Sequence, residues 1–435
     1  MTAMKASEDL PSWLRASFVF FLASLLLGSA AMYVQIGIVF ILTCIFFRWA
    51  GLKETVPRLL QCAKPMWWML IGFAVIFSVS IFARHSISFL ELGELKWILF
   101  LSIFSLFFVA VPFELRLSPM EKIAVGFLLL VLVYSLLDSF SQVTTGKGYG
   151  RHYLFGDELV YSKRGRGLLT NPIPFADVVG SFFCISALGA AASFSVKKKR
   201  LGVVMVTVAL LSFICVLNSL SRGVWFAIGM TSLFSLFVLP KSFRKIYYLG
   251  IGIAGVIGLT TLLVSPMYLR RFLSAFSVEM RSNEIRLQLW HANWEMLKEN
   301  PLGLGFNVND SLLPSKLAEL GYPESSFMSH PHNEFLDYAA ATGWLGIALY
   351  LGVTIWFLVF SVKLLRKYTK SGNVGAGYLI TSSILVQIFL NCCALTDQFT
   401  TPARFLICIA WAVPLALMTR GQNGDNKKLI VSSSQ

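Results

Sequence analysis

Runs of apolar residues about as long as a membrane helix recur along this chain, and they constrain its fold more than any other feature. The 435 residues are 56% hydrophobic and only 14% charged, and the mean hydropathy is +0.70. A soluble protein of this size carries more charge, so most of the surface must face lipid. Runs of about 20 apolar residues indicate helices that cross the bilayer. The sequence therefore predicts an all-α polytopic membrane protein.

About 12 transmembrane helices are expected, with a large loop between the ninth and the tenth. Their centres lie near Leu22, Val39, Phe73, Ile103, Leu130, Cys184, Ala209, Met230, Ala254, Leu349, Leu385 and Ile409. This number of spans places the short basic connectors 197–200, 241–245 and 363–370 on one side of the membrane, together with both termini. Because Lys and Arg are enriched in cytoplasmic loops, that side is predicted to be the cytoplasm.

The expected domains follow from these spans. They are a cytoplasmic N-terminus (1–15), transmembrane helices 1–9 (16–267), a periplasmic loop with helices that carry the active site (268–337), transmembrane helices 10–12 (338–419) and a cytoplasmic tail (420–435). Two outer segments, 146–166 and the start of the long loop, are rich in Lys and Arg although cytoplasmic loops usually carry these residues. Binding of an anion is the simplest reason to export basic residues.

Cysteine and carboxylate patterns argue against bound metals. Six of the seven cysteines fall in apolar runs, Cys62 falls in a basic loop, and there is no C-x-x-C pair. This pattern favours buried thiols over a disulfide framework or a zinc site. The outer loops also lack a tight carboxylate cluster that would hold Mg²⁺. We therefore expect no cofactor, no metal and metal-independent chemistry.

Two arginines are candidates for anion binding, because guanidinium holds phosphate oxygens by paired, charge-assisted hydrogen bonds. Arg222 lies between apolar runs at the predicted outer boundary, where it either caps a helix or serves a site. Arg286 begins an amphipathic helix, and near a helix N-terminus anions are also favoured by free backbone N–H groups. One face of that helix, predicted to pack as core, carries Leu287, Trp290, Trp294 and Leu297.

His332 is the candidate general base. A neutral imidazole accepts a proton near pH 7, which few other side chains do without a shifted pKa. The alternative is a histidine that only forms hydrogen bonds at the start of a helix. His330, separated from it by Pro331, is either a second functional group or a surface residue.

Four short motifs resemble, in the same order, those of the O-antigen ligase family (the WaaL type, within the Wzy-C superfamily). They are Arg166-Gly167-Leu168-Leu169-Thr170-Asn171-Pro172, Ser221-Arg222-Gly223, Arg286-Leu287-x-Leu289-Trp290 followed by the turn at 301–305, and His332-Asn333 nine residues before Gly343-Trp344-Leu345-Gly346. Each motif is weak alone, but their joint order across residues 166–346 is specific to the superfamily.

This resemblance implies a membrane glycosyltransferase of the GT-C type in the inner membrane of a Gram-negative bacterium. It would transfer a glycan from undecaprenyl pyrophosphate to lipid A–core oligosaccharide at the periplasmic face, surrounded by membrane lipids and with no nucleic-acid partner. By the same analogy Arg222 and Arg286 hold the pyrophosphate and His332 deprotonates the acceptor hydroxyl. The residues assigned to substrate binding are Arg166, Arg281, His330, Asn333 and Asp397.

Three other functions remain open at this stage. O-antigen polymerases and protein O-oligosaccharyltransferases share these motifs and the donor chemistry, and they differ in the acceptor. A transporter that binds a polyprenyl-pyrophosphate lipid without reacting would also explain the basic exterior. It predicts charges along the bundle on both sides of the midplane, however, whereas the apolar spans here are nearly free of charge.

Overall fold

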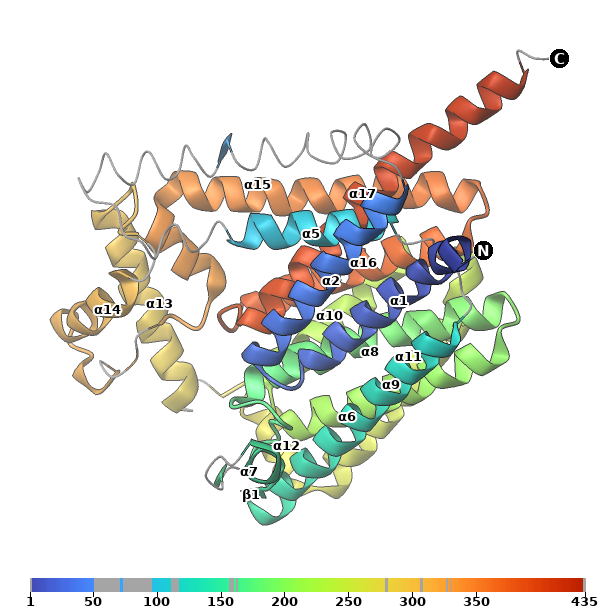
Figure 1. Cartoon of the computed structure of the whole chain (residues 1–435). Coiled ribbons are helices and arrows are strands. Elements are labelled where there is room, and N and C mark those ends of the chain that lie inside the picture. Colours follow the sequence, from blue (N-terminus) through green and yellow to red (C-terminus); the bar gives the residue numbers. More distant parts are fainter. Residues whose placement is uncertain are drawn as a thin grey trace.

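The computed structural model describes residues 2–50, 71–72, 96–110, 117–155, 160–161, 163–277, 281–305, 308–325, 328 and 330–432 (Figure 1). Its helices are α1 (Thr2–Ser24), α2 (Ser29–Ala50), α5 (Lys96–Ala110), α6 (Pro119–Thr145), α7 (Gly150–Phe155), α8 (Pro172–Ser195), α9 (Lys199–Ser219), α10 (Arg222–Val238), α11 (Lys241–Val264), α12 (Pro266–Leu273), α13 (Arg281–Glu299), α14 (Val308–Glu319), η2 (Pro323–Ser325), α15 (Glu334–Lys370), α16 (Val374–Ala394) and α17 (Thr401–Ser432). In the described residues, the only strands are β1 (Lys147–Gly148) and β2 (Val160–Tyr161), which pair antiparallel.

The prediction of a helical, polytopic membrane protein is confirmed. Within the described residues, eight helices are long and apolar enough to cross a membrane, and α5 and α10 are shorter apolar helices. Eleven of the twelve predicted centres lie inside helices of the structure. The twelfth, Phe73, lies outside the described residues. Twelve spans therefore remain a prediction.

Helix α8 forms the centre of the bundle (Figure 1). It begins immediately after its N-cap Asn171, whose side chain accepts a hydrogen bond from the backbone N–H of Ile173. Pro172 occupies the first turn. Both residues favour a helix start, because they deal with N–H groups that have no partner inside the helix. Nearly every residue from Phe175 to Ser193 is buried, against α9, α11, α16 and α17. The start of α8 is thereby held in a fixed place.

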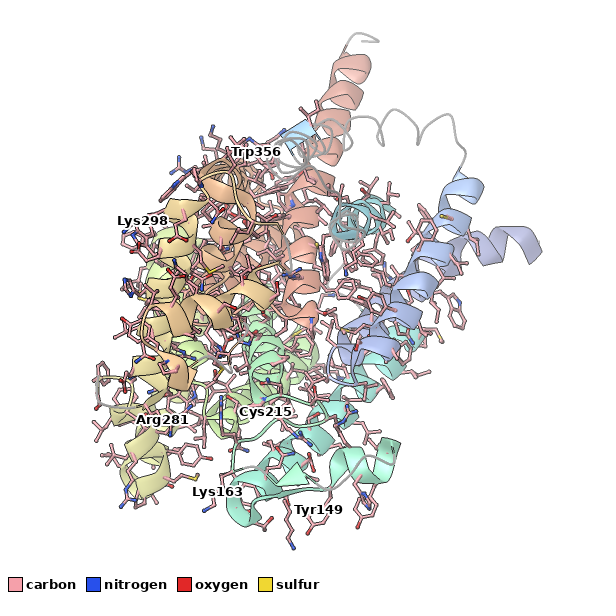
Figure 2. The ribbon with its side chains drawn as sticks, turned by 90° about the vertical axis from the view of Figure 1, so that its left-hand side faces the viewer. Tyr149, Lys163, Cys215, Arg281, Lys298 and Trp356 are labelled. Atoms are coloured by element: carbon pink, nitrogen blue, oxygen red, sulfur yellow. The ribbon has the colours of Figure 1, made fainter. Side chains whose placement is uncertain are left out.

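Helices α13 and α14 cover one end of the bundle, hereafter the α13 end. Figure 2 looks onto this end, where Arg281 and Lys298 mark the two ends of α13, which runs across the membrane helices instead of along them. A small core joins the two helices, and its buried residues are Leu289, Ala292, Met296, Leu313 and Leu317. Such a second core holds the two helices together apart from the main core of the bundle.

The predicted apolar face of α13 is confirmed at two of its four positions. Leu297 is buried, and Trp290 packs against the core that α13 shares with α14. Leu287 is 51% and Trp294 42% exposed. The residues of α13 that are buried against α14 form a neighbouring stripe, which is also spaced as one face of a helix. Helical spacing alone cannot show which of two apolar faces meets a partner. Trp294 packs edge-on against Trp344, with ring centroids 5.5 Å apart.

A kink at Gly343 separates the first turns of α15 from its membrane-spanning part. Gly343 has φ 71° and ψ −171°, a conformation that favours glycine. The turn at 301–305 packs into this kink and repairs the broken helical hydrogen bonds: Trp344 N–H donates to Pro301 O (3.0 Å) and Leu304 N–H to Ala340 O (2.8 Å). A Cβ on Gly343 would overlap the Pro301 carbonyl oxygen. The turn at 301–305 and the glycine motif at 343–346 therefore pack together as one structural unit, hereafter the joint.

The ends of α10, α15 and α16 lie at the α13 end of the bundle. Arg222, which begins α10, donates to Asn283 in α13 (2.8 Å), and Asn333, before α15, donates to the Leu395 carbonyl after α16 (3.2 Å). The opposite ends of these helices carry the basic connectors 241–245 and 363–370. Figure 1 shows both chain termini at that opposite end. The arrangement agrees with the basic segments facing one side.

We predict that the α13 end faces the periplasm, because the short basic connectors lie at the other end. In a cysteine-free version of the chain, a cysteine at the exposed position Ser315 should react with an impermeant maleimide added to intact spheroplasts. A cysteine at Ser195, the last residue of α8, should react only after permeabilisation. Labelling in the reverse order would invert the topology.

We predict that Gly343→Ala destabilises the protein, because the new methyl group overlaps the turn at 301–305 and the φ of 71° is strained for alanine. Strain of this kind costs about 1–3 kcal/mol before the overlap is counted. Gly352→Ala is the matched control: it lies in the same helix and its Cβ would have nothing within 4 Å. Thermal unfolding in detergent should show a lower midpoint for the first variant only. Equal midpoints would contradict the kink's role.

Candidate active site

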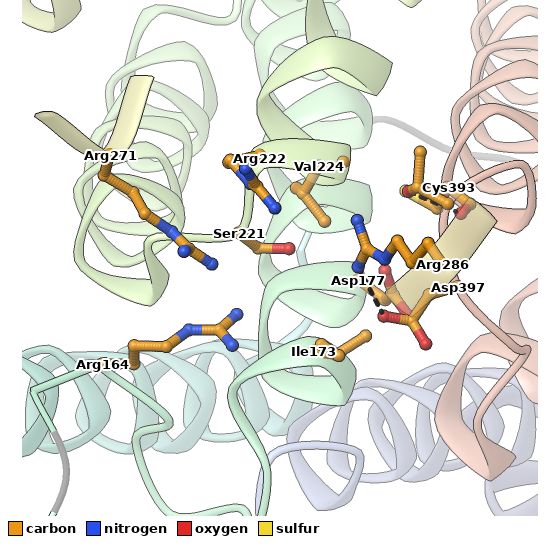
Figure 3. Close-up of a pocket in the computed structure, with 12 residues that line it drawn as sticks. Arg164, Ile173, Asp177, Ser221, Arg222, Val224, Arg271, Arg286, Cys393 and Asp397 are labelled. Atoms are coloured by element: carbon orange, nitrogen blue, oxygen red, sulfur yellow. Dashed lines mark hydrogen bonds and ion pairs between the residues drawn. The ribbon is translucent and has the colours of Figure 1, made fainter. Parts of the chain in front are cut away.

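A pocket opens at the α13 end where α8, α10, α12 and α13 meet the segment between α16 and α17 (Figure 3). It encloses about 380 Å³, including its open mouth. Its lining consists of Arg164, Ile173, Asp177, Ser221, Arg222, Gly223, Val224, Arg271, Arg286, Cys393, Thr396 and Asp397. Four arginines and two aspartates in one pocket of a membrane protein give it a strongly positive character.

Two of these arginines are held by the backbone at the end of α9. Leu220 has φ 51° and ends the helix in the left-handed conformation. The Ser219 carbonyl accepts a hydrogen bond from Arg164 Nε (3.3 Å), and the Leu220 carbonyl accepts one from Arg271 Nε (2.9 Å). Figure 3 shows both guanidinium groups directed toward the pocket. Adjacent carbonyls at one helix end thus position two cations side by side.

The pKa values of these arginines reflect their crowding. Burial, and after it the nearby Arg164 and Arg286, lower the pKa of Arg271 to about 10. Burial also lowers the pKa of Arg164, as do Arg286 and Arg222, while Asp397 opposes the shift. Arg271 still carries its proton near pH 7, so the charges repel one another. A bound anion would relieve that repulsion.

Arg222 braces the pocket as well as lining it. One Nη donates to the carbonyl and hydroxyl oxygens of Ser274 (2.5 and 3.2 Å), and the other donates to Ser282 Oγ (3.0 Å) and Asn283 Oδ1 (2.8 Å). These contacts tie α10 to the start of α13. A Cβ on the next residue, Gly223, would overlap Thr396, so glycine lets α10 approach the segment after α16. Arg222 therefore contributes to both the positive charge and the shape of the pocket.

Asp397 links the pocket to the candidate base. Its Oδ1 lies 3.0 Å from His332 Nδ1, and its Oδ2 lies 3.9 Å from Arg286 Nη2. An ionised carboxylate only accepts hydrogen bonds, so it selects the tautomer with a proton on Nδ1. The Nε2 lone pair of His332 is then available to take another proton. His332 is not among the lining residues and reaches the pocket through Asp397.

The segment around His332 is held in a strained conformation. His332 has φ 51°, which is uncommon for a residue other than glycine and is typical of functional sites. Trp290 Nε1 in α13 donates to the Pro331 carbonyl (3.0 Å). Asn333 caps α15 by accepting from the N–H groups of Phe335 and Leu336. These bonds fix the orientation of the imidazole ring.

Glu334 holds the Asp397 segment from the other side. Its backbone N–H donates to the Asp397 carbonyl (3.2 Å), and its carboxylate accepts from the Phe399 N–H (2.8 Å) and lies 3.6 Å from Arg404. Glu334, in the first turn of α15, therefore positions the carboxylate partner of His332, which lies just before the same helix.

The remaining predicted site residues lie around the pocket without lining it. The Arg166 guanidinium donates to the Thr170 carbonyl of its own loop (2.9 Å). Arg281 is exposed at the start of α13. The His330 ring packs edge-on against His332, with centroids 4.1 Å apart. The Asn333 side chain caps the start of α15. The structure thus brings together Arg222, Arg286, His332 and Asp397, and their roles remain predictions.

Sequence reasoning missed Arg164, Arg271 and Asp177 as lining residues. Arg164 and Arg271 belong to the two basic outer segments, whose charge is visible in the sequence, but the sequence does not show which of these basic residues face the pocket. Asp177 lies inside an apolar run, six residues after the cap Asn171. A single acid in a membrane helix is itself a signal, because such groups usually face a cavity.

Chemically, the arrangement combines a cationic pocket with an oriented base next to it. Among the residues that the structure describes, no group of three or more His, Cys, Asp and Glu side chains is placed to hold a metal ion. The guanidinium groups can stabilise negative charge, and the His332–Asp397 pair can accept a proton.

Comparison with known proteins points to one family. No curated protein matches the chain. A family model described as O-Antigen ligase (Wzy_C) matches residues 207–351. This span includes Arg222, Arg271, Arg286 and His332, and it ends shortly after the kink at Gly343. Residues 207–351 are therefore similar to the O-antigen ligase domain that this family model describes.

Proposed function

We propose that the protein is an O-antigen ligase. It would transfer a glycan from undecaprenyl pyrophosphate to lipid A–core oligosaccharide at the periplasmic face of the bacterial inner membrane. The family supports membrane glycan transfer of the ligase or polymerase type, acting on lipid-linked glycans. The contact of His332 with Asp397, 3.0 Å apart at the edge of a pocket with four arginines, carries the proposal for this chain.

In the proposed reaction, His332 acts as the general base. Its Nε2 takes the proton of an acceptor sugar hydroxyl while that oxygen attacks the anomeric carbon of the donor glycan. The bond between this carbon and the pyrophosphate oxygen breaks as the new glycosidic bond forms. Asp397 stabilises the imidazolium that results, because the carboxylate is hydrogen-bonded to the other ring nitrogen.

The arginines stabilise the leaving group. The departing lipid pyrophosphate gains negative charge, and preorganised guanidinium groups in a site with little water stabilise it strongly. Arg286, Arg271 and Arg164 surround the pocket, and Arg222 adds its charge while bracing α13. In this proposal the cations perform the role that a metal ion has in other enzymes.

An assay of the purified protein tests the function as a whole. Donor glycan on undecaprenyl pyrophosphate is mixed with rough lipopolysaccharide, and a ligase should produce a ladder of higher mass on the lipopolysaccharide. Longer glycans that remain on the polyprenyl carrier would instead identify a polymerase. Binding of the donor without any product would favour a transporter.

We predict that His332→Ala lowers turnover about 10²–10⁴-fold, as expected for loss of a general base, while donor binding changes little. His332→Gln, which cannot take the proton, should do no better. His291→Ala is the matched control, since this histidine lies on the exposed side of α13, 3.2 Å from the Tyr322 hydroxyl. Turnover and donor affinity are measured separately. Near-normal turnover by the Gln variant would show that His332 only positions the acceptor.

We predict that replacing Arg286 or Arg271 with Lys weakens donor binding and transfer about tenfold each. The positive charge remains, but a charge-assisted hydrogen bond worth about 1.5–3 kcal/mol is lost. Arg270→Lys is the control, because Arg270 is an exposed neighbour of Arg271 outside the pocket. Donor titrations of the three variants provide the comparison. Equal affinities would argue against paired hydrogen bonds to the pyrophosphate.

A further inference from the structure

Asp177 is the one acidic side chain of the pocket that the proposed reaction does not use. It lies on α8, the central membrane helix, and it is 3% exposed. Figure 3 shows its carboxyl group near Arg286 and Asp397, and it lines the same pocket as the four arginines. The position of a buried acid in the wall of a cationic pocket requires a physical explanation.

The bonding of Asp177 is incomplete. Its Oδ1 is fully buried and has no hydrogen-bond partner among the described residues. Cys393 on α16 lines the same pocket. No ion pair joins Asp177 to any arginine that the structure describes, whereas Arg286 pairs with Asp397. The carboxyl group therefore has arginines nearby and none of them as a direct partner.

An ionised carboxylate in this position would be costly. Buried charges without a direct partner are strongly disfavoured, and the negative charge of Asp397 nearby adds repulsion. A protonated carboxyl group has an O–H donor that an ionised one lacks. A donor in a pocket for anions is useful, because O–H···O⁻ hydrogen bonds to charged oxygens are short and strong.

We propose that Asp177 is protonated in the resting protein and donates a hydrogen bond from its buried carboxyl group to a phosphate oxygen in the arginine pocket. This rests on the proposed function, since it assigns a further binding residue for the same pyrophosphate. Asp177 adds a directed, uncharged donor to the guanidinium groups. It is a binding residue and takes no part in proton transfer to His332.

The alternative is an ionised Asp177 that partly neutralises the arginines. The two possibilities predict opposite effects on anion affinity. Removal of a negative charge from the pocket should strengthen binding of an anion, whereas removal of a hydrogen-bond donor should weaken it. Asparagine keeps an N–H donor in nearly the same shape, and alanine keeps none.

The test is binding of undecaprenyl pyrophosphate without glycan to the full-length protein in detergent. We expect Asp177→Ala to weaken binding about tenfold at pH 7 and Asp177→Asn to weaken it less than about threefold, in line with the loss or retention of one charge-assisted hydrogen bond. Ser181→Ala is the matched control: Ser181 lies one turn further along α8, is buried, and does not line the pocket. Stronger binding by both Asp177 variants would overturn the proposal.

A pH series provides a second comparison that does not depend on the alanine variant folding. The wild-type protein should lose affinity as Asp177 ionises at higher pH, and Asp177→Asn should not show this loss. The other charged or titratable groups that face the pocket are Arg164, Arg222, Arg271, Arg286, Cys393 and Asp397, with His332 behind Asp397. These groups are the same in both proteins, so the effect of their titration on affinity is the same in both pH profiles. Parallel pH profiles would contradict the proposal.

The same experiment separates this inference from the proposed function. If the wild-type protein does not bind the pyrophosphate lipid at all, both fail. If the wild-type protein binds it and Arg271→Lys weakens binding, but neither Asp177 variant does, the proposed function stands and the inference about Asp177 is wrong.

Discussion

The Asp397 carboxylate is the contact on which the candidate site depends. It joins three segments far apart in sequence: its own segment after α16, His332 before α15, and Arg286 in α13. One carboxylate cannot serve both partners unless all three segments are held rigidly. Glu334 holds the Asp397 segment and Trp290 holds Pro331. The surrounding hydrogen bonds are therefore part of the site, because a small displacement would separate the base from the pocket.

The position of α13 also depends on the joint between the turn at 301–305 and the kink at Gly343. Backbone hydrogen bonds across this joint replace those that the kink removes from α15. Glycine is needed on both sides, since a Cβ on Gly303 or Gly343 would overlap the partner backbone. Arg222 contacts the first turn of α13, and the turn at 301–305 follows its last residue, so α13 is fixed at both ends. The spacing of the motifs thus follows from backbone packing as much as from chemistry.

The sequence predicted the helical membrane fold, and it singled out His332, Arg222, Arg286 and Asp397, because apolar runs and charged outer residues are local signals. It could not predict that Arg164 and Arg271 are anchored to successive carbonyls, since that depends on the left-handed end of α9 at Leu220. Nor could it choose between the two apolar faces of α13, which differ only in where α14 packs. The motif of Arg166 is also present, but its guanidinium group donates to a carbonyl of its own loop and does not line the pocket, so its role in substrate binding stays a prediction.

The charges of the pocket suggest why four arginines are present rather than two. With Asp177 protonated, only Asp397 offsets the four guanidinium groups that line the pocket. In the proposed reaction the donor is a diphosphate with sugar and lipid at its ends, and it gains a further negative charge when its bond to the sugar breaks. A pocket with an excess of positive charge therefore favours the departing product over the bound donor. Interactions that strengthen as charge develops accelerate the chemical step, whereas those that bind both states equally do not.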